Sequence, residues 1–337
     1  MSSIGENERI DLLDFLRGFA LAGIILVNIG PLLSVDPPAA GTAASAYWRF
    51  LYLFIEGRFY TIFTFLFGVG FYLFISRANS RGRNGTVLFI RRITILLLFG
   101  LVHVQFHPGE ALTVYAVSGL LLLPFYKVKR DINLVFAIVM LVVLAFFAAK
   151  IFMVIPLMLL GIAAGQYHVF ERITQLKKAT AIFTVIMFLS GAAGLIFQYQ
   201  SAPPLPISAN DAHPVQMQQF ISRGITIGPL VSAFYAGCMV LLLQNHFFRK
   251  LLAPLKRYGR MAFTNYILQT VLILLAGKVL GQVNPLTCLQ SLLICIIIIM
   301  IQLLFSTFWL RYFKFGPLEW VWRALTYLEF PPMRKRT

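Results

Sequence analysis

The stretch LTCLQSLLICIIIIMIQLLFSTFW, residues 286–309, contains no charged side chain. A helix that crosses a bilayer needs about 20 mostly apolar residues, because lipid cannot hydrogen-bond an exposed peptide group. This stretch therefore predicts a membrane-spanning helix. Nine further runs of similar character precede it, at 14–34, 51–76, 89–106, 111–126, 132–149, 151–168, 179–199, 224–244 and 261–280.

The composition agrees with a polytopic membrane protein. Hydrophobic residues make up 59% of the chain and charged residues only 12%, which excludes an ordinary soluble domain. No polar linker separates the runs, so we expect a single all-α membrane domain of about ten helices. Its parts would be a cytoplasmic N-terminus at 1–13, a transmembrane bundle at 14–309 and a cytoplasmic interfacial tail at 310–337.

The net charge of +17 arises from basic residues in alternate loops. With ten spans these loops fall on one side, and the positive-inside rule places that side and both termini in the cytoplasm. A nucleic-acid-binding protein would instead gather its basic residues in one soluble domain, so we exclude that class. The basic residues in question are Arg77, Arg81, Arg83, Arg91, Arg92, Lys127, Lys129, Arg130, Arg172, Lys177, Lys178, Arg249, Lys250, Lys256, Arg257, Arg260, Arg311, Lys314, Arg334, Lys335 and Arg336.

The sequence lacks the usual motifs for disulfide bonds, metal binding, covalent catalysis and secretion. Cys238, Cys288 and Cys295 fall within predicted spans without a paired spacing, which indicates small buried residues. The five histidines show no metal-ligand spacing, and no Ser or Cys occupies a nucleophile motif. The acidic, polar start at 1–11 does not resemble a signal peptide. The outer loop at 200–222 is either a plain connection, which we favour, or a lid.

Three polar side chains fall within or beside the first run, where an ionisable group is costly unless it is paired or faces water. On a helical wheel, Asn28 projects within about 20° of Arg17 and about 40° of Asp14, so the three form one stripe. Asp14 and Arg17, three residues apart, can form an ion pair. The stripe indicates either a polar contact between helices or the wall of an internal pocket.

The second run begins near Glu56, Arg58 and Tyr60 and continues through Gly68 and Gly70. On the predicted topology the two charged residues enter from the outer face, where positive charge is otherwise scarce. We expect Arg58 to meet either Glu56 or a substrate anion. We expect both glycines to allow close packing of helices.

The densest group of chemically active side chains follows the third run. His103 and His107 are expected to share a helical face that the following Pro-Gly pair ends, and Glu110 comes next. A carboxylate beside an imidazole can form a general base, because it fixes the tautomer and stabilises the imidazolium. We therefore expect His103 to line a cavity and pair with Glu110. In the alternative, His103 bonds a backbone carbonyl and Glu110 pairs with Arg58.

The ninth run places Asn265 and Gln269 on one face, with Arg260 near its cytoplasmic mouth. The later stretch FGPLEWVWR, residues 315–323, suits an interfacial segment and could equally cap a cytoplasmic pocket. Buried polar side chains that cannot face lipid must meet each other or water. We therefore expect the stripes of the first, second, third and ninth runs to converge on one cavity.

Five motifs occur in order along the chain and carry a resemblance to a known family. They are DFLRGFALAGI at 14–24, FYTIFTFLFG at 59–68, RR at 91–92 with FGLVH at 99–103 and GEALTVY at 109–115, GRMAFTNY at 259–266, and FGPLEW at 315–320. On these motifs the sequence resembles the YeiB-like family of bacterial inner-membrane proteins over nearly its whole length. The resemblance implies a multi-pass protein of the bacterial cytoplasmic membrane and leaves the activity open.

The pattern Asp14-x-x-Arg17-Gly18 followed by Asn28 is similar, more distantly, to the transmembrane acyltransferases. This similarity implies about ten helices, acyl-CoA taken from the cytoplasm, an acceptor reached across the membrane, and a histidine base. Those enzymes usually place the essential histidine between the first two helices. Here no histidine precedes His103.

The resemblance thus implies transfer of an acyl group from cytoplasmic acyl-CoA, acetyl-CoA above all, to a hydroxyl or amine, with no tightly bound cofactor. His103 would deprotonate the acceptor and Glu110 would orient its ring. The residues expected at the donor are Asp14, Arg17, Asn28, Arg260 and Asn265. The residues expected at the acceptor are Arg58, Tyr60, His107, Tyr115 and Gln269.

Two other function classes stay open. A transporter or flippase for a small metabolite or lipid-linked intermediate would also use intramembrane charges. A structural membrane component would use them only for helix contacts. The expected partners are the bilayer and a small-molecule, glycan or lipid-linked acceptor, and a homodimer is left open.

Overall fold

The computed structural model describes residues 6–36, 38–173, 175–203, 214–280 and 286–335. In these ranges the chain is mostly helical, and its only β-structure is an isolated bridge between Phe313 and Arg334. The helices are α1 Glu6–Leu33, α2 Ala43–Phe50, α3 Arg58–Ser80, α4 Gly85–His103, α5 Ala111–Leu121, α6 Arg130–Phe146, α7 Val154–Gln166, α8 Lys177–Tyr199, α9 Pro214–Leu242, α10 His246–Leu251, α11 Ala253–Arg260, α12 Ala262–Leu280, α13 Cys288–Tyr312 and α14 Pro317–Tyr327. Shorter turns are the π-helical η1 Leu51–Ile55 and the 3₁₀ turns η2 Leu123–Lys127 and η3 Val169–Glu171.

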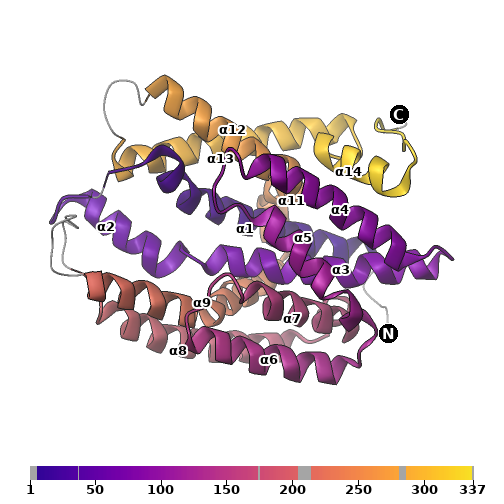
Figure 1. The fold of residues 1–337 in the computed structure, drawn as a ribbon, viewed down its shortest axis with the longest axis horizontal. Coiled ribbons are helices and arrows are strands. Elements are labelled where there is room, and N and C mark those ends of the chain that lie inside the picture. The colour runs from indigo at the N-terminus through magenta and orange to yellow at the C-terminus, as the bar shows by residue number, and fades with distance from the viewer. Residues whose placement is uncertain (1–5, 37, 174, 204–213, 281–285, 336–337) are drawn as a thin grey trace.

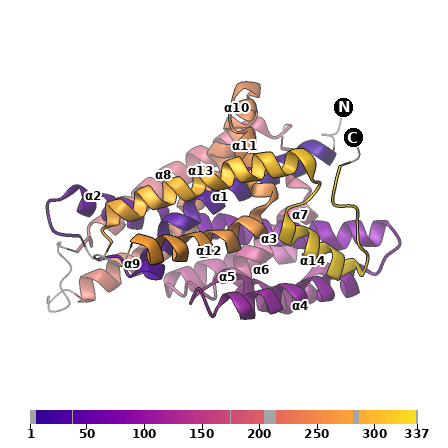
Figure 2. The same cartoon turned by 90° about the horizontal axis from the view of Figure 1, so that it is seen from above.

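Most of the long helices run along the longest axis of the molecule (Figure 1). Helices α1 and α3 lie centrally, between α12 and α13 on one side and α6 to α9 on the other. Helix α3 packs against α1 and α7, and α4 packs against α5 and α14. The short α10 and α11 stand across this direction, as Figure 2 shows, and α11 crosses α1.

Seven segments among the described residues are long and apolar enough to cross a membrane, so the chain is a multi-pass membrane protein. They are Asp11–Leu33, Ala43–Ser80, Gly85–His103, Lys177–Tyr199, Val215–Leu242, Ala262–Leu280 and Cys288–Tyr312. The outer side chains of α8, including Ile186, Leu189 and Ile196, are more than half exposed, as expected for a lipid-facing surface.

All ten apolar runs of the sequence coincide with helices, but not all of these helices have spanning length. Helices α5, α6 and α7 contain 11, 17 and 13 residues, fewer than the roughly 20 that a spanning helix needs. The predicted number of ten spans and the cytoplasmic placement of both termini therefore stay predictions.

Three boundaries differ from the sequence-based expectation. The second run is interrupted at Gly57, whose φ of +76° separates η1 from α3. Helix α4 ends at His103, so His107 lies in the following loop. The prediction that His103 and His107 share a helical face was therefore wrong. The predicted loop at 200–222 is partly helical because α9 begins at Pro214, and its residues 204–213 lie outside the described part of the chain.

The two glycines of the second run have different roles. A Cβ at Gly68 would lie 2.0 Å from the backbone oxygen of Met158 in α7, so the predicted close packing at Gly68 is confirmed. A Cβ at Gly70 would meet only the Arg17 side chain, at 3.4 Å, so the same prediction for Gly70 was wrong. Gly70 instead leaves room for a polar side chain of α1.

Candidate functional site

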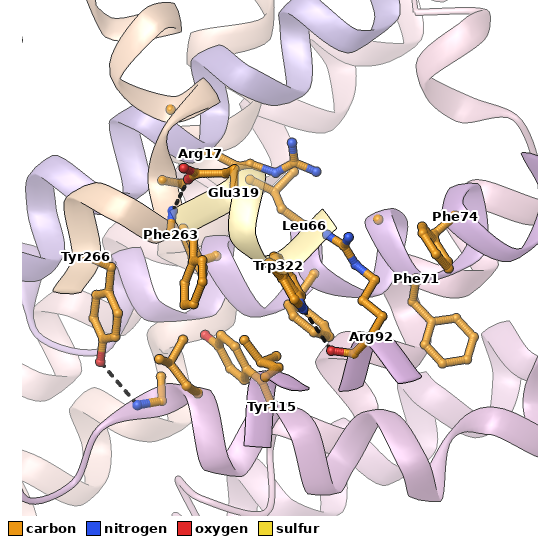
Figure 3. A pocket seen from close by; sticks show the side chains of 18 of the residues that line it. Arg17, Leu66, Phe71, Phe74, Arg92, Tyr115, Phe263, Tyr266, Glu319 and Trp322 are labelled. Atoms are coloured by element: carbon orange, nitrogen blue, oxygen red, sulfur yellow. Dashed lines mark hydrogen bonds between the residues drawn. The ribbon is translucent and has the colours of Figure 1, made fainter. Parts of the chain in front are cut away.

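A cavity of about 1080 Å³ lies among α1, α3, α4, α5, α11, α12 and α14 (Figure 3). Gly57, which precedes α3, and Arg81, which follows it, both line this cavity. The cavity therefore follows the whole length of α3, about 34 Å at 1.5 Å per residue. Its volume is slightly above the range of roughly 300–1,000 Å³ that is typical of small-molecule and cofactor sites.

One end of the cavity, called here the arginine end, is strongly positive. Glu319 and Glu329 also line it, and Asp14 pairs with Arg17 at 3.0 Å. Three carboxylates thus oppose seven arginines, which leaves four positive charges in excess. The seven arginines are Arg17, Arg77, Arg81, Arg83, Arg92, Arg260 and Arg323.

Aromatic rings lie beside these arginines. The guanidinium carbon of Arg92 is 3.5 Å from the centre of the Trp322 ring and 5.0 Å from that of Phe74. The indole of Trp322 donates a hydrogen bond to the backbone oxygen of Arg92 at 2.8 Å. Figure 3 shows Arg92 and Trp322 side by side at the cavity. Because these contacts use ring faces, they do not consume the guanidinium N–H groups.

Glu319 attaches α14 to the start of α12. One carboxylate oxygen accepts from the backbone N–H groups of Phe263 and Thr264 at 2.8 and 3.0 Å, and the other accepts from the Thr264 hydroxyl. Burial raises the pKa of the Glu319 carboxyl, and the hydrogen bonds from Thr264 and Phe263 oppose that rise. Helix α14 therefore forms a wall of the arginine end, which matches the pocket-capping alternative for the stretch 315–323.

The middle of the cavity is aromatic. Tyr60 and Phe63 of α3 face Tyr115 of α5, with ring centres 5.9 and 6.2 Å from that of Tyr115. The Tyr115 hydroxyl lies 2.8 Å from that of Thr64. Asn28 of α1 also lines the cavity, so its predicted stripe with Arg17 faces the cavity. The opposite end, called here the Lys150 end, is lined by Glu56, Gly57, Lys150 and Ile151.

The predicted proximity of His103 and Glu110 is confirmed. The Nδ1 atom of His103 lies 3.6 Å from a Glu110 carboxylate oxygen, and both side chains are buried. Glu110 caps α5 by accepting from the backbone N–H groups of Leu112 and Thr113. Burial alone would raise the pKa of Glu110, but the neighbouring His103 ring and the hydrogen bonds from Thr113 and Leu112 outweigh it and lower the pKa. Glu110 is therefore a carboxylate.

His103 does not line the cavity, contrary to expectation, whereas Glu110 does. The other ring nitrogen of His103, Nε2, lies 2.9 Å from the Thr270 hydroxyl, and Nδ1 of His107 lies 3.2 Å from the same oxygen. Both imidazoles also lie against the ring of Tyr266, which lines the cavity. Sequence reasoning missed Thr270, although it follows Tyr266 by four residues and so shares its helical face.

Five other expected site residues lie outside this cavity. Asp14 acts through its pair with Arg17. The side-chain amide of Asn265 donates to the Tyr258 carbonyl and the Ser306 hydroxyl, at 3.0 and 2.8 Å. That of Gln269 donates to the Tyr258 hydroxyl at 2.6 Å. These two amides therefore join helices, and neither faces lipid, since both are almost fully buried. Arg58 and His107 also lie away from the cavity lining.

Among the described residues, Arg58 forms no ion pair with the carboxylate of Glu56 or with that of Glu110. Its guanidinium donates to the backbone oxygens of Glu56 and Gly224 and to the side-chain oxygen of Gln198. The Glu56 carboxylate pairs instead with Lys150. The alternative in which Arg58 pairs with Glu110 was therefore wrong.

The strongest signal that sequence reasoning missed is the arginine end itself. Arg77, Arg81, Arg83 and Arg92 were interpreted only as markers of membrane orientation, and Arg323 only as part of an interfacial segment. The residues that the structure describes contain no group of three His, Cys, Asp or Glu side chains that could hold a metal ion.

Comparisons with known proteins show which family the chain is similar to. Residues 164–329 match the model of a family described as a protein of unknown function (DUF418). An uncharacterised 39.9 kDa protein encoded beside an amylase gene of Bacillus acidopullulyticus is 55% identical, over 100% of this chain and 99% of its own. The uncharacterised proteins YxaH of Bacillus subtilis and YeiB of Escherichia coli are each 28% identical, over 98% of this chain and 97% and 99% of theirs. The chain therefore belongs to the YeiB-like DUF418 family of proteins of unknown function.

Proposed function

We propose that this protein is an acyltransferase of the bacterial cytoplasmic membrane. It would bind acyl-CoA at the arginine end, facing the cytoplasm, and transfer the acyl group to a hydroxyl or amine. The observation that carries the proposal is the excess of positive charge at one end of a long, otherwise aromatic cavity.

The arginine end suits the head of coenzyme A. That head carries three phosphate groups, and guanidinium groups bind phosphate oxygens through paired, charge-assisted hydrogen bonds. The exposed part of Trp322, beside Arg92, offers a flat surface for the adenine ring. The pantetheine arm and acyl chain would then extend along α3 towards Tyr60, Phe63 and Asn28.

The reaction itself needs a base and a group that stabilises the oxyanion. In the proposal, the acceptor O–H or N–H gives its proton to the Glu110 carboxylate as its oxygen or nitrogen attacks the thioester carbonyl. The C–S bond then breaks, and the leaving thiolate takes the proton. The side-chain amide of Asn28 would donate to the developing oxyanion.

Glu110 keeps the capacity for this step despite its contacts. Each of its oxygens accepts one backbone N–H, and a carboxylate oxygen has two lone pairs. His103, behind Glu110, would act as a positioning residue that keeps the carboxylate charged. This modifies the expected roles, in which His103 was the base and Glu110 its support.

The test uses purified full-length protein and native membranes that contain it. Calorimetry with acetyl-CoA and with acetyl-pantetheine should show binding that requires the phosphates. Transfer of labelled acetyl groups from acetyl-CoA should fall at least 100-fold in Glu110→Gln, while acetyl-CoA binding is unchanged. Glu329→Gln is the matched control, because Glu329 lines the same cavity but lies exposed beside Arg83. Absence of CoA binding would overturn the proposal.

Transport of a phosphate-bearing amphiphile is a second candidate. It is favoured by a cavity lining that extends from the Lys150 end to the arginine end, along the whole of α3. Proteoliposomes would distinguish the two functions. Movement of a labelled phospholipid-like anion without acyl-CoA supports transport, whereas acetyl transfer without such movement supports the enzyme.

A further inference from the structure

A second, smaller cavity of about 60 Å³ adjoins the Lys150 end of the main cavity. It lies among η1, α3, α7, α8 and α9 and shares four lining residues with the main cavity, Glu56, Gly57, Tyr60 and Lys150. A cavity needs about 10–15 Å³ to hold one water molecule. A volume of 60 Å³ therefore fits an ion of a few heavy atoms and excludes a nucleotide or lipid.

Arg58 is the dominant group of this small cavity. Its side chain is only 1% exposed, although a buried cation is costly unless it has a counter-charge. Every acceptor that the structure gives it is neutral: the carbonyl oxygens of Glu56 and Gly224 and the amide oxygen of Gln198, the last at 2.8 Å. Its Nε atom is buried and has no hydrogen-bond partner.

The site is built to hold Arg58 in this position. The amide nitrogen of Gln198 donates to the carbonyl oxygens of Tyr52 and Phe220, at 3.3 and 3.2 Å, so its oxygen must face Arg58. Gln198 is itself 1% exposed. A Cβ at Gly224 would lie 2.6 Å from the Gln198 amide nitrogen, so a larger residue there would displace that amide.

The charges around the small cavity do not balance. Glu56 is the one carboxylate among its lining residues, and Lys150 already pairs with it. Arg58 thus leaves one positive charge in excess. Lys150 is 47% exposed, so an ion from outside can reach this end of the molecule.

We infer that the small cavity binds one small monovalent anion, of the size of chloride or acetate, through Arg58. Such an anion supplies the missing charge and accepts the unpaired N–H of Arg58. Its source is either a free ion or the carboxylate of a ligand in the main cavity. The inference is independent of acyl transfer, because nothing in it involves coenzyme A.

Two glycines provide a matched pair of variants. Gly228 of α9 lines the small cavity, and a Cβ added there meets no atom within 4 Å, so Gly228→Ala fills ion space without a clash. Gly30 of α1 also has no atom within 4 Å of an added Cβ and does not line either cavity. Both glycines lie in helices, and each precedes a proline: Pro229 follows Gly228 and Pro31 follows Gly30. Both substitutions should therefore change the conformational free energy of the backbone by a similar amount.

The experiment is thermal unfolding of the full-length protein in detergent. Sodium gluconate, too large for the cavity, is replaced at constant ionic strength by sodium chloride or sodium acetate. Both wild type and Gly30→Ala should gain about 2 °C or more in unfolding midpoint, because a ligand that binds only the folded state stabilises it. Gly228→Ala should need at least tenfold more anion for the same gain, and Arg58→Gln should gain nothing.

The outcomes distinguish a free anion from a ligand carboxylate, and both from the absence of an anion site. A gain with chloride alone indicates a free halide, and a larger gain with acetate indicates a carboxylate ligand. Should Gly228→Ala respond as Gly30→Ala does, or should wild type not distinguish either anion from gluconate, the site does not exist. If Arg58→Gln fails to fold, the comparison of Gly228→Ala with Gly30→Ala still tests whether the small cavity binds an anion.

Discussion

Polar side chains lie between the apolar helices in two contrasting settings. In the sealed cluster, Tyr258, Asn265, Gln269, Gln302 and Ser306 are each at most 2% exposed, and their donors reach acceptors within the protein. At the arginine end, the charged groups face an open cavity and contact ring faces as well as carboxylates. The sealed cluster joins helices through these hydrogen bonds, whereas the arginine end keeps donors for a ligand.

The largest effect that tests this contrast should come from two glycines on one helix. Gly68→Ala places a methyl group 2.0 Å from the Met158 backbone oxygen, which cannot move without separating α3 from α7. We expect a loss of about 3 kcal/mol or more and little folded protein. Gly70→Ala faces the cavity and should stay within about 1 kcal/mol of wild type. The measurements are the amount of folded protein in the membrane and its unfolding midpoint. Equal values for both variants would contradict the contrast between close helix packing at Gly68 and open space at Gly70.

The second prediction concerns the open setting. Replacing both Arg92 and Arg323 by Gln should raise the Kd for acetyl-CoA at least about 100-fold, which is about 2.7 kcal/mol or more, because each charge-assisted hydrogen bond contributes about 1.5–3 kcal/mol. The unfolding midpoint should change little, since both arginines contact mainly ring faces. Calorimetry measures the affinity. Arg172→Gln, an exposed arginine away from the cavity, is the control and should bind normally.

The third prediction concerns the sealed setting. Gln302 accepts from the Tyr258 hydroxyl and donates to the Asn265 carbonyl. Gln302→Leu removes both contacts and leaves a buried hydroxyl without its acceptor, so we expect a loss of about 2 kcal/mol in stability. Acetyl-CoA affinity should not change. A weaker affinity in this variant would show that the cluster belongs to the binding site.

The smallest effect is expected where the two settings meet. Glu319 caps α12 and fixes α14 at the arginine end. Glu319→Ala should cost about 1–2 kcal/mol, as the loss of a helix cap does. Glu319→Gln keeps an oxygen for the two backbone N–H groups and should recover most of the stability. Comparable losses in both variants would indicate that the negative charge, and not the cap, holds α14.

Much of the fold could be predicted from the sequence because the relevant patterns are local. Each apolar run coincides with a helix, and the stripe of Arg17 and Asn28 faces a cavity as the helical wheel indicated. The proximity of His103 and Glu110 was also predicted, since only a short loop separates them. Helix α4, however, ends four residues before His107, because local periodicity defines a boundary poorly.

The candidate site could be predicted only in part, since most of its residues carry no local signal. Arg92 and Trp322 lie 230 residues apart in the chain and yet share a hydrogen bond and a ring contact. In the sequence, Arg92 is indistinguishable from the basic residues that set membrane orientation. Asn265 and Gln269 were expected at the donor and acceptor, yet they bond neighbouring helices, and a helical wheel does not tell which neighbour lies beyond a given face.

The sequence by itself determined the membrane setting, the positions of the helices and the stripe on α1. Each depends on hydrophobicity and on a period of 3.6 residues, which are properties of neighbouring positions. The tertiary structure alone decided that seven arginines from α1, α3, α4, α11, α14 and the α3–α4 loop converge on one end of a cavity. It also decided that Arg58 is enclosed among neutral acceptors. Both outcomes depend on which helices pack together, and that choice follows from close contacts such as Gly68 against Met158, between segments far apart in the chain.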